Sequence, residues 1–369
     1  MDARASQNVL VHPSGIRLTA NKENHTHSIP QSILTTLTLL YYPAMEIYDS
    51  DRVFERIGII GAGAIGGYYG ARLAAAGNEV HFLLHSDYEF VREHGLTIDS
   101  VRGDIFLPTP NVHANFHDMP QCDLVIIGLK AVKNAILDVI LPSVLAPDGL
   151  VLTLQNGMGA DDDIARIVGP DHVAGGLCFI CSNKVGPGHV NHLDYGKITI
   201  GEYAPDFGSR GVTPRLQALS DQFNAAGIET EALGDLVLGR WRKLMWNIPY
   251  NGMSVLMNAT TDEMVHDPKL RPLFRRLMAD VQAGAAAYGR TIPDTFADLM
   301  IELTDKMTPY ATSMMLDFRA GREMEVEAIY GNPLRLAADR GVTLPYIEMA
   351  YRQLSHVNAR ILARRAPKV

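Results

Sequence analysis

Short apolar runs alternate with helical segments between residue 56 and about residue 234. The runs are rich in Ile, Val and Leu, which is typical of strands covered on both faces of a parallel sheet. We predict strands at 56–60, 79–84, 123–128, 149–154 and 173–180, with a helix at 131–142 between the third and the fourth. Repeated strand–helix units of this kind predict an α/β fold with a Rossmann-type, doubly wound parallel sheet.

After residue 180 the pattern changes to that of a hairpin. Between residues 185 and 202, Val, Leu and Ile alternate with polar residues between glycine turns. Such alternation predicts antiparallel strands that extend the sheet. A polar loop at 203–213 and a helix at 214–226 follow.

Beyond about residue 235 the strand signal ends and long segments of helical period follow. Helices are predicted at 235–258, 267–288, 294–306, 312–320, 323–340 and 345–362. At 369 residues the chain is also too long for a single core. We therefore predict a Rossmann-like nucleotide-binding domain at 56–234 and an all-helical substrate and catalytic domain at 235–369, with the ligand cleft between them.

Residues 1–55 differ from the rest of the chain. They are rich in Ser, Thr, Asn and His, and they show no clear periodicity before the first strand. They also lack the charged start and apolar centre of a secretory signal. We predict a disordered N-terminal extension, with Met45 as a candidate working start. A transit peptide is the alternative, because the stretch is poor in acidic residues.

Composition narrows the classes of protein to which the chain can belong. Hydrophobic residues make up 47% and charged residues 20%, as in ordinary globular enzymes. The formal net charge of −8 argues against a basic face for nucleic acid. No apolar run reaches the ~20 residues that a membrane-spanning helix needs. We therefore expect a cytoplasmic protein without nucleic-acid or membrane partners.

Three cysteines are too few for a disulfide framework and fit a reducing compartment. Cys178 and Cys181 form a C-x-x-C pair, a spacing also found in redox and zinc sites. Their neighbours are those of a buried strand, however, and no second pair or paired histidines complete a metal site. We predict two core cysteines and no metal.

The first strand leads directly into a glycine-rich turn, Gly61-Ala62-Gly63-Ala64-Ile65-Gly66. In a G-x-G-x-x-G turn the glycines allow a tight bend, close approach of a pyrophosphate and close packing of helix on strand. A helix from Tyr68 to about Ala76, ended by Gly77, would point its free N–H groups at the phosphates. Strand, turn, helix and second strand follow within ~30 residues, which favours a dinucleotide site over a purely structural turn.

A polar stripe marks the first predicted helix of the second domain. Positions advance by about 100° per residue, so Lys243, Asn247, Asn251 and Asn258 share one face. Asparagine is a poor helix former, and a merely solvated face would favour Glu, Lys or Gln. We therefore predict a ligand-binding face. Pro249 interrupts this helix and is expected to kink it.

A second polar cluster spans residues 312–327. Ser313 and Glu325 would lie too far apart in one straight helix to share a site. Gly321 offers a helix stop that lets the chain turn back. Glu325 would then lie near the start of a helix, where a carboxylate is favoured. The alternative is an exposed helical carboxylate.

Five landmarks that occur in order along the chain resemble the ketopantoate reductase (2-dehydropantoate 2-reductase) family. They are the turn Gly61–Gly66, Gly128-Leu-Lys130 after the third strand, Gln155-Asn-Gly-Met-Gly159 after the fourth, Lys243-x-x-x-Asn247-x-x-x-Asn251, and Ser313-Met with Asp317, Gly321-Arg and Glu325. Each is weak alone, but their order is specific. The resemblance covers residues 56 to about 355.

The resemblance implies a role for each of these residues. Lys243 would be the general acid and Glu325 its carboxylate partner, while Asn247, Asn251 and Ser313 would hold the substrate. Asn258, on the same stripe, is added to the substrate-binding set. Lys130 and Asn156 would line the junction of cofactor and substrate. The cofactor-binding set is Gly61, Ala62, Gly63, Ala64, Ile65, Gly66, His85, Lys130 and Asn156.

The end of the second strand departs from the family pattern. An arginine is often found there, whereas this chain has Leu84-His85-Ser86-Asp87. His85 and Ser86 can bind a 2′-phosphate, with Arg72 or Arg92 as further cations, but Asp87 is a residue type typical of NAD enzymes. By resemblance we expect NADP(H), and NAD(H) stays the alternative.

The expected activity is reduction of 2-dehydropantoate to pantoate, a step of pantothenate biosynthesis, by an NADP-dependent oxidoreductase. Reduction of another branched 2-oxo acid on the same scaffold is the first alternative, and a non-catalytic NADP(H)-sensing protein is the second. The expected partner is the small 2-oxo acid, and a homodimer is left open beside a monomer.

Overall fold

The computed structural model describes residues 54–309 and 311–365, which fall within one compact unit, residues 51–369. The extension predicted at 1–55 lies outside the described residues except at its last two positions. The division of the unit at residue 234 stays a prediction. For description, residues before 235 are called the sheet half and those after it the helical half.

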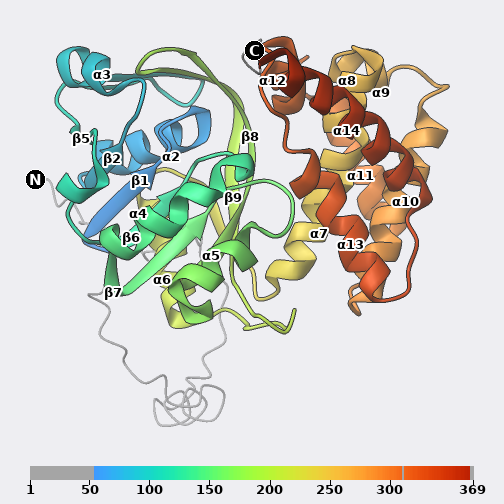
Figure 1. Cartoon of the computed structure of the whole chain (residues 1–369), viewed down its shortest axis with the longest axis horizontal. Coiled ribbons are helices and arrows are strands. Elements are labelled where there is room, and N and C mark those ends of the chain that lie inside the picture. Colours follow the sequence, from blue (N-terminus) through green and yellow to red (C-terminus); the bar gives the residue numbers. More distant parts are fainter. Residues whose placement is uncertain (1–53, 310, 366–369) are drawn as a thin grey trace, which may run out of the picture. The chain divides into compact units, whose positions relative to one another are not determined.

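The sheet half is built on one mixed sheet of ten strands among the described residues (Figure 1). The strands are β1 Arg56–Ile60, β2 Glu79–Leu83, β3 Leu96–Ser100, β4 Ile105–Leu107, β5 Asn111–His113, β6 Cys122–Ile127, β7 Leu145–Thr153, β8 Val173–Gly186, β9 His189–Glu202 and β10 Thr230–Ala232. Their order is β4-β3-β9-β8-β7-β6-β1-β2-β5, with β10 beside β9. The central strands pair in parallel and β8 pairs with β9 in antiparallel fashion, so the predicted fold class is confirmed.

The buried centre of the sheet follows the apolar runs closely. Ile57, Ile59 and Ile60 of β1 are almost fully buried, and Ile126 and Ile127 of β6 are completely so. Such strands have both faces covered, here by the helices of the sheet half (Figure 1). Two strands run further than predicted: β7 begins at Leu145 and β8 continues to Gly186.

The helices of the sheet half are α2 Ala64–Ala75, α3 Tyr88–His94, α4 Leu137–Val144, α5 Ala160–Val168 and α6 Pro214–Ala225, with short 3₁₀ turns at Phe116–Asp118, Ala131–Ile136 and Pro170–His172. Helix α2 begins at Ala64, earlier than the predicted Tyr68, because Gly63 is already its N-cap. It ends as expected, with Gly77 in the left-handed region at φ +91°.

The described residues beyond 235 contain no strand, as predicted. The elements are α7 Leu236–Trp246, a π-helical turn η4 Asn247–Gly252, α8 Met253–Met257, α9 Thr261–Val265, α10 Arg271–Ala287, α11 Asp294–Lys306, α12 Ser313–Arg319, a second π-helical turn η5 Glu327–Gly331, α13 Asn332–Asp339 and α14 Pro345–Arg365. None of the described helices is long and apolar enough to cross a membrane.

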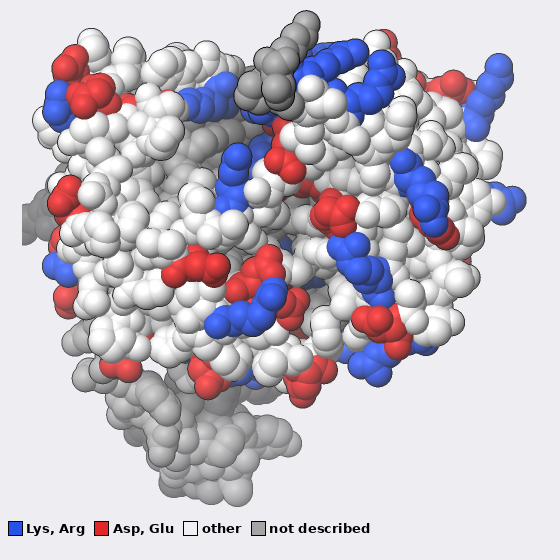
Figure 2. Space-filling view, in the orientation of Figure 1, with Lys and Arg blue, Asp and Glu red and all other residues white. Residues whose placement is uncertain are grey.

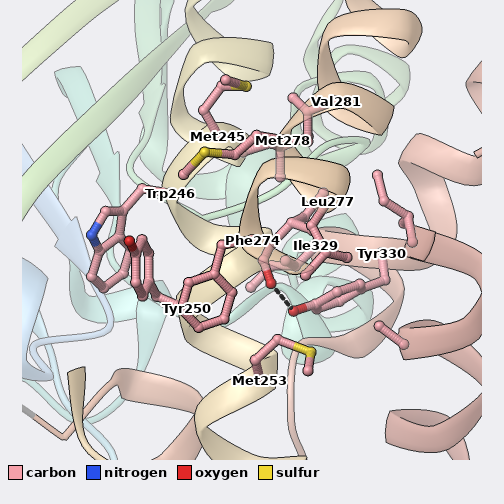
Figure 3. Close-up of a cluster of buried hydrophobic side chains, with 14 of the residues drawn as sticks. Met245, Trp246, Tyr250, Met253, Phe274, Leu277, Met278, Val281, Ile329 and Tyr330 are labelled. Atoms are coloured by element: carbon pink, nitrogen blue, oxygen red, sulfur yellow. Dashed lines mark hydrogen bonds between the residues drawn. The ribbon is translucent and has the colours of Figure 1, made fainter. Parts of the chain in front are cut away.

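The structure accommodates Pro249 in a π-helical turn between α7 and α8. Proline has no N–H and crowds the preceding turn, so the helix widens where the regular hydrogen bond is lost. Tyr330 of η5 bonds to this widened turn. Its hydroxyl donates to the Ile248 carbonyl at 2.7 Å and accepts from the Gly252 N–H at 2.9 Å. Figure 3 shows Tyr330 reaching this turn beside Met253, within the apolar core of the helical half.

Candidate functional site

The glycine turn keeps its three glycines for two different reasons. A Cβ on Gly66 would lie 2.3 Å from the Gly61 carbonyl oxygen, and one on Gly61 would lie 2.7 Å from the Leu129 nitrogen. These two glycines are required by packing, and Gly61 also has φ +90°. A Cβ on Gly63 would meet no atom of the described residues within 4 Å. Space is thus left at the N-terminus of α2, where free N–H groups favour a phosphate.

A pocket of about 310 Å³ opens beside this turn. Gly61, Ala62 and Gly63 line one side, and the segment from Leu83 to Asp87 lines another. The predicted His85 is therefore at the pocket, and its side chain is exposed. Ala64, Ile65 and Gly66 continue from the pocket into α2. A glycine turn, a helix N-terminus and a pocket beside the end of β2 together fit a dinucleotide.

The two arginines suggested as additional cations are engaged elsewhere. The Arg72 guanidinium donates to the Tyr68 hydroxyl at 2.9 Å and to Ser100 Oγ at 3.1 Å. Arg92 pairs with Glu89 on the same helix. The pocket wall instead contains Lys184, near the end of β8, which sequence reasoning missed. Lys184 pairs with Asp87 at 2.5 Å, and no local motif indicates a partner so distant in the chain.

Lys130, directly after β6, reaches across to the helical half. Its amine forms an ion pair with the buried Asp317 of α12, which also accepts from Arg322 Nε at 2.9 Å. Burial lowers the pKa of Lys130, Glu325 opposes that shift, and Arg322 adds to it. The Glu325 carboxylate accepts from the Ala131 N–H at 2.9 Å. Burial raises the pKa of Glu325, and the cation that opposes this is Lys130.

Asn156 lies in the loop after β7, and this loop packs tightly on the helical half. A Cβ on neighbouring Gly157 would lie 2.2 Å from the Ala328 carbonyl oxygen. The Met158 N–H donates to that same carbonyl at 2.8 Å. The structure thus places Asn156 at the boundary of the two halves, half-buried.

A buried ion pair fixes the base of the same loop. Arg240 of α7 donates to both carboxylate oxygens of Asp161, at 2.9 and 2.6 Å, and to the Gln155 carbonyl at 2.7 Å. Both side chains are buried. A bidentate pair of this kind is strong, and breaking it would leave a charge buried without a partner.

Lys243 lies on α7 with its amine directed at β8. The amine donates to the Cys178 carbonyl and lies 5.3 Å from the centre of the Phe179 ring. Burial lowers the pKa of Lys243 to about 8, because few neighbouring groups compensate its charge. Among the described residues, no hydrogen bond or ion pair joins Lys243 to Glu325.

The carboxamide stripe is brought together in part. Asn247 is 2% exposed, and its Nδ2 has no hydrogen-bond partner in the described structure. Asn251 is also buried; its amide donates to Ser313 Oγ at 3.4 Å and accepts from the Met314 N–H at 3.0 Å. Asn258 differs from both of these residues. It is exposed, and it ends α8 in the left-handed region at φ 50°.

The prediction of core cysteines is confirmed. Cys178 and Cys181 are both buried and free. Burial raises the pKa of Cys178 to about 11 and that of Cys181 to about 12, so neither is a reactive thiolate at neutral pH. On the face shown in Figure 2, acidic and basic side chains are interspersed.

Comparison with known proteins gives matches over both halves. The family model "Ketopantoate reductase PanE/ApbA" matches residues 57–205, and "Ketopantoate reductase PanE/ApbA C terminal" matches residues 235–358. A 2-dehydropantoate 2-reductase of Nostoc sp. is 51% identical over 306 residues, which cover 83% of this chain and 96% of that protein.

Solved structures agree with these matches. The crystal structure of 2-dehydropantoate 2-reductase from Geobacter metallireducens is 38% identical, with a TM-score of 0.78 over 82% of this chain and 99% of that one. The ternary structure of D-mandelate dehydrogenase with NADH and anilino(oxo)acetate has a TM-score of 0.76 over 83% of this chain and 99% of that one. At 21% identity, this second likeness concerns the fold alone.

Proposed function

The chain belongs to the ketopantoate reductase family, and we propose that it reduces 2-dehydropantoate to pantoate with NADPH. The main support is a single arrangement on one helix. An amine with its pKa lowered to about 8 lies one turn from a buried amide nitrogen that has no hydrogen-bond partner among the described residues. A proton donor beside an unsatisfied hydrogen-bond donor suits an anionic substrate whose carbonyl oxygen gains negative charge.

Lys243 is proposed as the general acid. A bound nicotinamide nucleotide would supply hydride to the C2 carbonyl of the 2-oxo acid. Negative charge then grows on the carbonyl oxygen, and the Lys243 ammonium stabilises it and donates a proton. A pKa of about 8 suits this task, because the amine is mostly protonated at neutral pH yet gives up its proton readily.

The amides and the hydroxyl of the helical half are proposed to hold the substrate. Within the part of the chain that the structure describes, Asn247 Nδ2 is buried without a hydrogen-bond partner, a costly state that a carboxylate or hydroxyl of the substrate would relieve. Asn251 orients the start of α12 and contacts Ser313 Oγ, so these two side chains act together. A substrate contact for Asn258 stays a prediction.

The charged groups at the boundary are proposed to complete the site. Glu325 is buried and bonded to the Ala131 N–H, next to the end of β6, where parallel sheets place their ligands. We propose that the negative charge of this carboxylate stabilises a protonated lysine side chain at the site. In this structure the cation that interacts electrostatically with Glu325 is Lys130, which acts to lower the pKa of the carboxyl group. Pairing of Glu325 with Lys243 stays a prediction.

The residues that would hold the nucleotide are the glycine turn, the end of β2 and the boundary residues. Gly61–Gly66 would take the pyrophosphate on the N-terminus of α2, and His85 would face the ribose end of the pocket. Lys130 and Asn156 would lie toward the substrate. The choice of NADPH over NADH is part of the proposal.

The test is an oxidation assay with NADPH and NADH across a panel of branched 2-oxo acids. With NADPH, kcat/KM for 2-dehydropantoate should exceed that for the other acids at least ~10-fold, the ratio that a few lost pocket contacts produce. Equal turnover of other branched acids would refute the substrate assignment. Nucleotide binding without any turnover would instead support a sensing protein. The cytoplasmic location and a homodimer stay predictions.

A further inference from the structure

The pocket beside the glycine turn has a charged wall that the proposed function leaves unexplained. Asp87, Lys184 and Gly188 meet there, although Asp87 follows β2 and the other two belong to the β8–β9 hairpin. Asp87 and Lys184 both line the pocket, together with His85 and Ser86. The hairpin therefore supplies part of a wall that the sequence pattern assigned to the β2 end alone.

Both oxygens of the Asp87 carboxylate are already engaged. Oδ1 accepts from Ser86 Oγ at 2.9 Å, while Oδ2 accepts from the Gly188 N–H at 3.0 Å and pairs with Lys184 Nζ at 2.5 Å. Asp87 is buried, and although burial acts to raise its pKa, the contacts with Lys184, Gly188 and Ser86 lower it overall. The carboxylate is thus a fixed anion that holds Lys184 in place.

Lys184 keeps donors to spare. An ammonium has three N–H donors and Asp87 occupies one of them, while the Lys184 side chain is 35% exposed toward the pocket. An NAD-specific site uses a free carboxylate at the end of β2 to accept from the ribose hydroxyls. Here Asp87 is poorly suited to that role, because it is buried against the hairpin and Lys184 compensates its charge.

We propose that Lys184 is a specificity-determining residue that binds the 2′-phosphate of NADPH from the hairpin, in place of the arginine that this chain lacks at His85. This inference rests on the proposed function, in that it assumes a nucleotide with a 2′-phosphate. Asp87 acts as a positioning residue, which holds Lys184 against the wall. Ser86, whose hydroxyl bonds to Asp87, lines the same pocket.

The experiment measures binding by the full-length chain, without turnover. Titrations of NADPH, NADH, 2′,5′-ADP and 5′-AMP are followed by calorimetry for the wild type and for Lys184→Met. Loss of one charge-assisted contact should weaken NADPH and 2′,5′-ADP ~10-fold or more and leave NADH and 5′-AMP within ~2-fold. Lys184→Arg should keep the preference.

Two further variants separate contact from charge. Lys197→Met removes a lysine of the same hairpin that pairs with Glu231, so it should leave all four affinities unchanged. Asp87→Asn with Lys184→Met removes the anion that the single variant leaves uncompensated. If the double variant fully regains NADPH affinity, Lys184 only neutralises Asp87 and the proposed contact is wrong.

The remaining outcomes are distinct. Equal weakening of all four ligands, or no weakening, overturns the role of Lys184 while the wild type still prefers NADPH. A wild type that prefers NADH overturns the cofactor assignment as well. The thermal midpoint of each variant, measured in parallel, identifies any variant that fails to fold. In that case Lys184→Gln, which keeps a side chain of similar length without the charge, takes the place of Lys184→Met and is judged by the same outcomes.

Discussion

The candidate site has two sides, one proposed for the nucleotide and one proposed for the substrate, and they are built in opposite ways. The nucleotide side is mostly backbone from consecutive residues, Gly61–Gly66, with space left by a missing side chain at Gly63. The substrate side is assembled from side chains on separate elements: Lys243 on α7, Asn247 and Asn251 on η4, and Ser313 on α12. Phosphates can be bound by main-chain N–H groups, whereas carbonyl reduction needs a proton donor placed in a desolvated position.

This difference allows the nucleotide side and the substrate side of the site to be tested separately. A substitution on the substrate side should change catalysis and spare nucleotide binding, and one on the glycine turn should do the reverse. Titration should affect the substrate side, where Lys243 lies, more than the turn, which has no ionisable side chain.

The largest effect is expected from Lys243→Ala. Removing the proposed proton donor should lower kcat by ~10²-fold or more. The Kd for NADPH should stay within ~2-fold, because the glycine turn is untouched. Steady-state kinetics and calorimetry measure the two quantities. An unchanged kcat would remove Lys243 from its assigned role. A loss of nucleotide affinity would show that the nucleotide side and the substrate side of the site are not independent.

The reverse substitution is Gly63→Val. Its side chain would occupy the free space at the N-terminus of α2, so NADPH affinity should fall at least ~10-fold, about 1.4 kcal/mol. The thermal midpoint should change little, because a Cβ there lies more than 4 Å from every neighbour that the structure describes. Gly66→Ala is the matched control: its Cβ clashes with the Gly61 carbonyl oxygen, and overpacking of this kind costs ~1–3 kcal/mol of stability. Undiminished affinity in Gly63→Val would place the pyrophosphate elsewhere.

The pH dependence should follow Lys243. Because the general acid must be protonated, kcat for reduction should fall above pH about 8, approaching ~10-fold per unit. Stability should move the other way. The folded pKa of about 8 lies below the usual 10.5, so the unfolded state binds the proton more tightly and the buried charge destabilises the fold below pH about 8. That cost disappears as pH rises from about 8 through 10.5.

Lys243→Met separates these two effects. Its thermal midpoint should exceed that of the wild type at neutral pH, and the difference should shrink toward pH 10.5. A constant difference across this range would mean that the amine is not desolvated.

The smallest effect on catalysis is expected from Tyr330→Phe. It leaves the Ile248 carbonyl and the Gly252 N–H without their bridging hydroxyl, at a cost of ~1–3 kcal/mol in stability. KM should rise a few-fold, because the turn that carries Asn247 and Asn251 loosens, while nucleotide affinity stays constant. Tyr288→Phe is the control, since that hydroxyl bonds only to the Leu336 carbonyl in the described structure. Equal KM values in both variants would refute the positioning role.

The sequence was most informative where the signal is local. Apolar runs located the central strands, and helix α11 was predicted with its observed ends, Asp294 and Lys306. Helix α3 and strands β3, β4 and β5 were missed, because each spans only three to seven residues, too few to establish a period against its surroundings. Lys184 was missed for another reason: its importance depends on Asp87, which only the folded hairpin brings near.

The position of Asn258 shows how a small backbone change defeats a helical wheel. A π-helical turn holds about one residue more than an α-helical turn, so every later residue is rotated by roughly 100°. The wheel placed Asn258 with Asn247 and Asn251 only because it assumed a regular helix. With η4 in between, Asn258 is exposed at the end of α8 while the other two are buried.

The Asp161–Arg240 pair limits the motion of the sheet half relative to the helical half. Separating a buried bidentate pair costs ~3–5 kcal/mol, because each charge would be left without a partner away from water. We therefore expect Asp161 and Arg240 to stay in contact whenever the sheet half and the helical half move relative to each other.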